Sequence, residues 1–219
     1  MRTSASGAPD ANVRFGNSCG AAAIGRVCTI CGSRSPQSAV RFPYAGGMPI
    51  TPDTKDWTWV LERPCAECGF SAADLDYDEV PALVRANAAA WAPVLDRPDV
   101  TVRPDDAIWS ALEYGAHVRD VFRIFDTRLG LILGEDDPFF ANWDQDATAV
   151  AERYNEQDPR VVAAELAEAA ASVADAFAAV PPADRQRTGR RSDGARFTVT
   201  TLAQYFIHDP THHLHDVAG

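Results

Sequence analysis

The chain has 219 residues, which suits one domain with a tail, and an apolar share of 46% is enough for a real core. A formal net charge of −11 at pH 7 argues against nucleic acid or an anionic membrane surface as the main partner. No apolar run approaches the ~20 residues needed to span a bilayer, and the start lacks the apolar region of a secretory signal. These features predict a cytoplasmic protein.

Residues 1–50 are expected to form a disordered or non-native N-terminal extension. They are rich in Gly, Ala, Ser and Pro and show neither helical nor strand periodicity, so they cannot bury enough surface to offset the entropy of ordering. The only methionines are Met1 and Met48, and protein-like sequence begins directly after Met48. We therefore expect the native product to start at Met48, which mass spectrometry of the natural protein would test.

The five cysteines include two C-x-x-C pairs, each followed by Gly. Cys28 and Cys31 form the first pair, Cys65 and Cys68 form the second, and Cys19 is left over. Two such turns can make a zinc ribbon, because each turn directs two thiolates at one tetrahedral ion. The unstructured setting of the first pair argues against a shared zinc, and a reducing cytosol argues against structural disulfides.

Residues 51–78 are interpreted as a separate segment that docks on the rest of the chain. Trp57 and Trp59 supply the apolar surface for docking, and Cys65 and Cys68 follow shortly after. Three roles remain open for these two thiols: a plain turn, a redox pair, or a small zinc knuckle completed by ligands from elsewhere. The turn is the favoured interpretation.

Residues 79–219 are predicted to fold as a four-helix bundle. The first helix is indicated by an apolar stripe at helical spacing: Val80, Leu83, Val84, Ala88, Trp91 and Leu95. Ser110 and Glu113 form an S-x-x-E capping box, so a second helix should begin at Ala111 and run to about Gly134.

The second half of the chain supplies two more predicted helices. Residues 135–157 are acidic and aromatic, which indicates a loop that packs against the bundle. Asp158 and Pro159 are the N-cap and first residue of a long helix that Pro181 ends. Thr198 can cap the last helix. Four helices joined by such loops indicate an all-α fold, most simply a four-helix bundle.

The histidines are concentrated near the C-terminus. His208 and His212 are four residues apart, so they lie on one helical face with Cβ atoms about 6 Å apart, a spacing that lets two imidazoles reach one ion. His117, in the second predicted helix, is the candidate third ligand. The alternative is a run of surface histidines with one core histidine, but the concentration in two helices favours a metal site.

Pro210 makes the orientation of these side chains uncertain. It lies between the two ligands of the last helix, where it removes a backbone hydrogen bond and is expected to kink the helix. Asp209 and His213 are also four residues apart and form a reserve pair of ligands. His215 continues the stripe of His208 and is a further reserve ligand.

Two motifs resemble those of the DinB-like superfamily, over roughly residues 79–217. Its second-helix motif, W-S-x-x-E-x-x-x-H, is matched by Trp109, Ser110, Glu113 and His117. Its last-helix motif, H-D-x-x-H, is matched by His208, Asp209 and His212. The resemblance implies a four-helix bundle that holds a divalent metal, often zinc or nickel, through His117, His208 and His212. This chain departs from the usual last-helix motif at Pro210, and it has "HLHD" where family members frequently have Gly-Gln after the last histidine.

The resemblance also implies a reaction class. Several relatives are thiol-dependent enzymes, namely mycothiol-dependent maleylpyruvate isomerase and transferases for mycothiol or bacillithiol. A metal-dependent S-transferase or isomerase, with a low-molecular-weight thiol as cosubstrate and a small electrophile as substrate, is therefore the leading functional hypothesis. A metal-dependent hydrolase and a non-catalytic metal-binding bundle, as monomer or homodimer, are the alternatives.

Residues near the predicted ligands are candidates for supporting roles. Glu113, one turn before His117, is a candidate for orienting that ligand through a hydrogen bond, and its alternative role is the capping box. Tyr114 and Tyr205 are candidate proton donors, although aromatic residues at helical spacing more often belong to the core.

Overall fold

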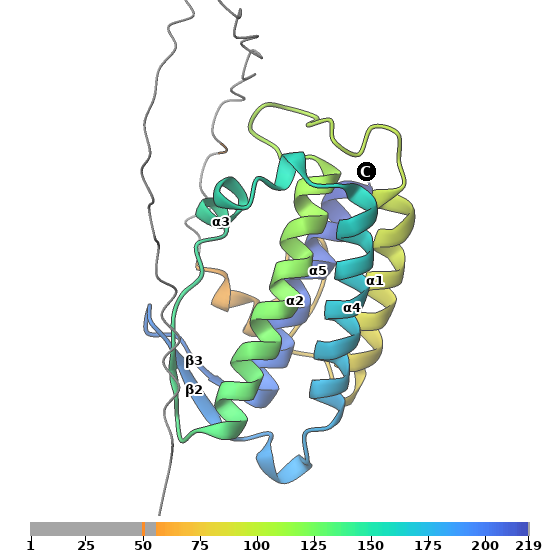
Figure 1. Ribbon diagram of the computed structural model, residues 1–219. Helices are drawn as coiled ribbons and strands as arrows, with labels where there is room; N and C mark the ends of the chain where they lie inside the picture. The colour runs from red at the N-terminus through yellow and green to blue at the C-terminus, as the bar shows by residue number, and fades with distance from the viewer. Residues whose placement is uncertain (1–49, 51–55, 219) are drawn as a thin grey trace, which may run out of the picture. The chain divides into compact units, whose positions relative to one another are not determined.

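The computed structural model describes residues 50 and 56–218 (Figure 1). None of the helices in this part is long and apolar enough to cross a membrane. Several sequence-based predictions fall on residues outside it: the N-terminal extension, Met48, Cys19, Cys28 and Cys31.

Four long helices form the bundle, as the sequence predicts: α1 (Val80–Leu95), α2 (Ala111–Gly134), α4 (Pro159–Ala178) and α5 (Val199–Ala218). Helices α1 and α2 each lie against both α4 and α5 (Figure 1). The apolar face of each helix is thereby covered by two neighbours, which is how amphipathic helices bury their apolar stripes.

The helix ends follow local signals in the sequence. Ser110 and Glu113 make both hydrogen bonds of the capping box at the start of α2. The Asp158 side chain accepts from the backbone N–H of Arg160 at the start of α4. At the start of α5, the backbone N–H of Thr201 donates to the Thr198 hydroxyl over 3.1 Å. The predicted capping residues therefore begin all three helices.

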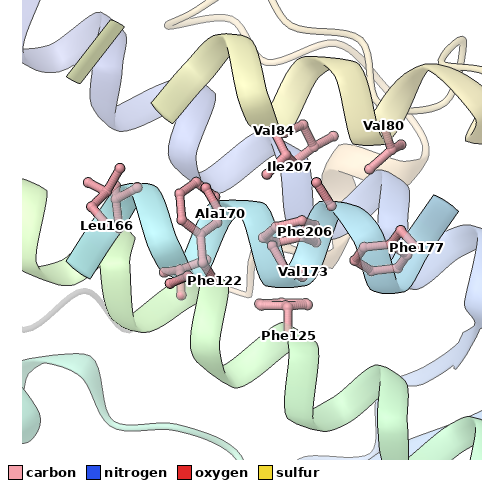
Figure 2. Packing of buried hydrophobic residues seen from close by; sticks show 14 of the residues in the cluster. Val80, Val84, Phe122, Phe125, Leu166, Ala170, Val173, Phe177, Phe206 and Ile207 are labelled. Atoms are coloured by element: carbon pink, nitrogen blue, oxygen red, sulfur yellow. The ribbon is translucent and has the colours of Figure 1, made fainter. Parts of the chain in front are cut away.

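Phe206 of α5 lies at the centre of the core. Its ring centroid is 5.8 Å from that of Phe122, 4.9 Å from that of Phe125 and 5.5 Å from that of Phe177. Figure 2 shows these rings between α2 and α4, with Val84 and Ile207 close by. Aromatic pairs in such arrangements contribute about 0.5–1.5 kcal/mol beyond the area they bury.

Residues 135–157, predicted as a packing loop, contain more structure than expected. They include β1 (Phe139–Phe140), the short helix α3 (Gln145–Ala151) and a 3₁₀ turn at Tyr154–Glu156. Strand β1 pairs in parallel with β2 (Thr188–Arg191), which pairs antiparallel with β3 (Arg196–Thr198). Strands this short have no detectable alternation in sequence, so the ladder depends on contacts between distant segments.

The turn and the centre of this sheet depend on glycine. Gly194, in the turn between β2 and β3, has a φ of +99°, which side chains rarely adopt. A Cβ added at Gly189 would lie 2.7 Å from Cγ1 of Ile132, so the absence of a side chain allows β2 to approach α2.

Residues 56–79, the described stretch directly before α1, contain only 3₁₀ helices, at Trp57–Leu61 (η1) and Tyr77–Glu79 (η2). It nevertheless lies against the bundle: η1 contacts α5, the Tyr77 hydroxyl donates to the Phe177 carbonyl over 2.8 Å, and Gln204 donates to the Leu75 carbonyl over 2.9 Å. This segment covers one side of α5.

Candidate metal centres

One group of candidate ligands joins α2 to α5. Nε2 of His117 lies 3.2 Å from Oδ1 of Asp209, and Nε2 of His213 lies 3.8 Å from the same oxygen. One donor atom from each of the three residues lies within 4.8 Å of the other two. We call His117, Asp209 and His213 the α2–α5 centre.

A second group joins α5 to the segment before α1. Cys65 lies against His212, and Cys68 lies against His208. The donor atoms of these four residues also lie within 4.8 Å of one another.

The predicted trio of His117, His208 and His212 is thus divided between two groups. The pair held in reserve, Asp209 and His213, is the pair that the structure places beside His117. His215 is exposed and belongs to neither group.

The division follows from the rotation of about 100° between successive residues of a helix. His208 and His212 share one stripe of α5, and Asp209 and His213 occupy the next. One stripe faces the segment before α1, and the other faces α2. The helix is continuous from Val199 to Ala218 despite Pro210, whose carbonyl accepts a hydrogen bond from Asn87 over 2.7 Å.

Aromatic rings hold the fully buried His117 in place. The Trp143 ring stacks on it at 5.2 Å with an interplanar angle of 8°, and the Trp109 ring lies 5.3 Å away. Nδ1 of His117 is buried and has no hydrogen-bond partner among the described residues. Packing therefore fixes the direction of Nε2. Sequence reasoning placed Trp143 in a packing loop but gave no signal that it contacts a candidate ligand.

Glu113 does not contact His117 through a hydrogen bond in the described part of the chain. Its carboxylate accepts from the backbone N–H and the hydroxyl of Ser110, each over 2.8 Å, and from Arg103 Nε over 2.9 Å. Burial opposes ionisation, but the Arg103 and Ser110 hydrogen bonds outweigh it and lower the pKa of Glu113. Its contacts are those of the capping box, which was the alternative role predicted for Glu113.

Replacing Glu113 with Gln should lower the free energy of unfolding by about 2 kcal/mol at pH 7, because a charged acceptor of several hydrogen bonds is lost. Since the folded pKa is below the unfolded value of about 4.3, this stabilisation is present above that pH and is lost as the pH falls through the folded pKa. Urea denaturation at pH 7 and pH 3 should show the difference between the variant and the wild type narrowing on acidification. A difference in unfolding free energy that is the same at pH 7 and pH 3 would contradict the ion pair between Glu113 and Arg103.

The protonation states of Asp209, His208 and His212 suit cation binding. Burial raises the pKa of Asp209, but the adjacent His117 and His213 outweigh it and lower the value to about 2. Burial, helped by the charge of His212, lowers the pKa of His208 to about 4, and burial also lowers that of His212. At neutral pH the carboxylate is ionised and both of these imidazoles are neutral, as metal ligands must be.

The spacing of the α2–α5 centre fits one divalent cation. Ligand atoms about 2.1 Å from an ion are separated by about 3.0 Å at octahedral angles and about 3.4 Å at tetrahedral angles. The separations from Asp209 Oδ1 are 3.2 Å to His117 and 3.8 Å to His213, and the two imidazole nitrogens lie within 4.8 Å of each other, so a shift of His213 toward the other two ligands would bring the set to this range. Oδ2 of Asp216 lies 2.9 Å from Nδ1 of His213 and holds its Nε2 toward Asp209.

Both groups adjoin one cleft of about 490 Å³. Asp209, His213, His208 and His212 are among its lining residues, as are Tyr114 and Tyr205. Among its described residues the lining has no Lys or Arg. It carries four carboxylates, those of Glu67, Asp146, Asp209 and Asp216. Burial, and then Asp216, raise the pKa of Tyr114 to about 12. The protein is therefore a four-helix bundle with an acidic cleft and two histidine-rich candidate metal centres on its last helix.

The sequence profile of the DinB superfamily matches residues 81–217, more than half of the chain, and the chain belongs to this superfamily. Among solved structures, it is similar to YfiT from Bacillus subtilis, described as a probable metal-dependent hydrolase with an unusual four-helix bundle topology. The similarity has a TM-score of 0.56 at 19% identity and covers 72% of this chain and 89% of that one, which shows a shared fold. No curated protein sequence matches the chain.

Proposed function

We propose that the protein is a metal-dependent hydrolase whose divalent cation is held by His117, Asp209 and His213. The observation that carries this proposal is the convergence of three ligand atoms from two helices, at the edge of a cleft. It is supported by the fold shared with YfiT, itself described as a probable metal-dependent hydrolase.

The donor set suits a Lewis-acidic cation with open positions. A divalent cation bound there would supply polarisation of a carbonyl or phosphoryl oxygen. Two imidazoles and one carboxylate are the ligands of several zinc hydrolases and of many non-haem iron(II) sites, so zinc and iron(II) are the metals that this set favours. Because Asp209 contributes a negative charge, this centre should be less Lewis-acidic than the three-imidazole set expected from sequence.

Residues beside the centre can position a substrate. The Tyr114 ring lies 4.9 Å from that of His213, and burial raises its pKa to about 12, so the hydroxyl is a weak acid that stays protonated at neutral pH. Tyr114 is therefore suited to donate a hydrogen bond to a substrate oxygen at this wall of the cleft. Asp216 acts as a positioning residue by fixing the tautomer of His213.

The charge of the cleft indicates the substrate class. Four carboxylates line it, and an anionic substrate would be repelled by those not neutralised by the cation. We therefore expect an uncharged or cationic small molecule. The thiol S-transferase and isomerase activities implied by the family resemblance would also need a bound cation, and a thiol that replaces water as the nucleophile would distinguish them from hydrolysis.

The test is turnover by metal-loaded protein across neutral, cationic and anionic esters and amides, with and without small thiols. Asp209→Asn and His213→Ala should each lower both metal affinity and kcat/KM by about 100-fold or more, because each removes a direct ligand. His215→Ala is the matched control, since it removes an exposed histidine of the same helix and should leave both unchanged.

Each outcome of this test has a defined meaning. Hydrolysis of neutral or cationic compounds that disappears in both variants would support the proposal. Turnover only with consumption of thiol would replace hydrolysis by transfer or isomerisation. Full metal occupancy with no turnover of any compound would favour the non-catalytic metal-binding bundle.

A further inference from the structure

The second group of candidate ligands combines two thiols and two imidazoles from opposite ends of the described chain. Sγ of Cys65 lies 3.6 Å from Nδ1 of His212, and Sγ of Cys68 lies 3.8 Å from Nε2 of His208. Both cysteines are free. The two pairs are separated by 147 and 140 positions in sequence, so only the fold brings them together.

These separations match a tetrahedral zinc ion. With Zn–S of about 2.3 Å and Zn–N of about 2.1 Å, a sulfur and a nitrogen at the tetrahedral angle are about 3.6 Å apart. The two observed S···N separations differ from this value by only a small amount. A single hydrogen bond between a thiol and an imidazole would explain one such pair. Two pairs side by side at nearly the same spacing are what a shared metal ion requires.

The two thiols have the C-x-x-C spacing of zinc-binding turns, and backbone hydrogen bonds fix the turn that carries them. In the stretch C-A-E-C-G, the backbone N–H of Cys65 donates to the Phe70 carbonyl over 2.8 Å, and that of Gly69 donates to the Cys65 carbonyl over 2.9 Å. Gly69 has a φ of +74°, which favours glycine at this position.

Aromatic rings and carboxylates surround the group, which borders the cleft through His208 and His212. Cys65, His208 and His212 are buried, and the rings of Trp57 and Phe70 lie 5.6 and 6.2 Å from that of His208. Nε2 of His212 faces two carboxylates, with Glu67 Oε2 at 3.3 Å and Asp216 Oδ1 at 3.6 Å. A carboxylate on the far nitrogen of a ligating imidazole is the usual second contact of a zinc site.

We propose that Cys65, Cys68, His208 and His212 form a structural zinc site, distinct from the α2–α5 centre and independent of any activity there. Four protein ligands leave no open position, which is the pattern of structural rather than catalytic zinc. The site fastens the segment before α1 to α5, and the described residues of that segment contain only 3₁₀ helices. It thereby holds Trp57 and Glu67 in the wall of the cleft.

Metal content and cobalt spectroscopy of the full chain test this proposal. Wild-type protein refolded or expressed with zinc should hold two equivalents, one at each centre. His117→Ala should lose the α2–α5 equivalent only, and Cys68→Ser should lose the other. In the cobalt(II) form, wild type and His117→Ala should both show a thiolate-to-cobalt charge-transfer band that Cys68→Ser lacks.

The control is a variant in which Cys19, Cys28 and Cys31 are all replaced by Ser. It should keep both equivalents and the charge-transfer band, and loss of the band there would assign the thiolates to other cysteines and overturn the proposal. Absence of the band from fully reduced, cobalt-loaded wild type would overturn it as well, without relying on the folding of any variant. Wild-type protein that shows the band but hydrolyses none of the tested esters and amides would refute the proposed function alone.

Discussion

Phe206→Ala should lower the free energy of unfolding by about 3–5 kcal/mol, a large fraction of the stability of an ordinary domain. The side chain is fully buried and is packed by three other aromatic rings, on α2 and α4. Truncation removes these contacts and leaves a cavity that rings held by two different helices cannot readily fill (Figure 2).

The measurement is equilibrium denaturation in urea, with Val161→Ala as the control. Val161 lies on α4 and its side chain is 52% exposed, so its truncation should change stability by at most about 0.5 kcal/mol. A loss below about 1 kcal/mol for Phe206→Ala would show that the four rings do not pack as described. Because Phe206 lies two residues before His208, metal affinity of the folded variant should also fall.

Asp120→Ala should lower the free energy of unfolding by about 3–5 kcal/mol, because it leaves a buried guanidinium without its main partner. Arg119 is 5% exposed and contacts both oxygens of Asp120, over 2.9 and 3.0 Å. The buried Tyr154 hydroxyl donates to the same carboxylate over 2.6 Å. Glu165 remains beside Arg119 in the variant but accepts from one nitrogen only.

The matched control is Asp175→Ala, which removes an ion pair with Arg85 whose side chains are 76% and 47% exposed. Exposed pairs contribute about 0–1 kcal/mol, so this variant should stay close to the wild type. Burial raises the pKa of Asp120, but Arg119 and Tyr154 outweigh it and lower the value. The effect should therefore be full above pH of about 4 and shrink as the pH falls through the folded pKa. Equal effects of the two variants at pH 7 would contradict the network.

The two candidate centres depend on the same short stretch of α5. His208 and Asp209 are consecutive, as are His212 and His213. In each pair the first residue lies beside Cys65 and Cys68, and the second lies beside His117 of α2. Fixing the rotation of α5 for one centre therefore fixes it for the other.

Local sequence determined the helices and therefore the architecture. Capping residues such as Ser110 and Asp158, and apolar stripes at helical spacing, act over a few residues and could be recognised without knowing any neighbour. The sequence also indicated that the candidate metal ligands are concentrated in α5, because almost all of the histidines are there. The short strands were not predictable, since β1 and β2 are stabilised by each other across a long stretch of chain.

Only the tertiary structure decided which ligands meet. Successive residues on a helix differ by about 100° in direction, so a modest rotation of α5 exchanges His208 for Asp209 as the neighbour of His117. That rotation is set by the packing of side chains such as Phe206 and Ile207 against other helices, which spacing along the chain does not contain. The sequence alone therefore determined which donors were available, while the packing of the core decided how they are shared between the two centres.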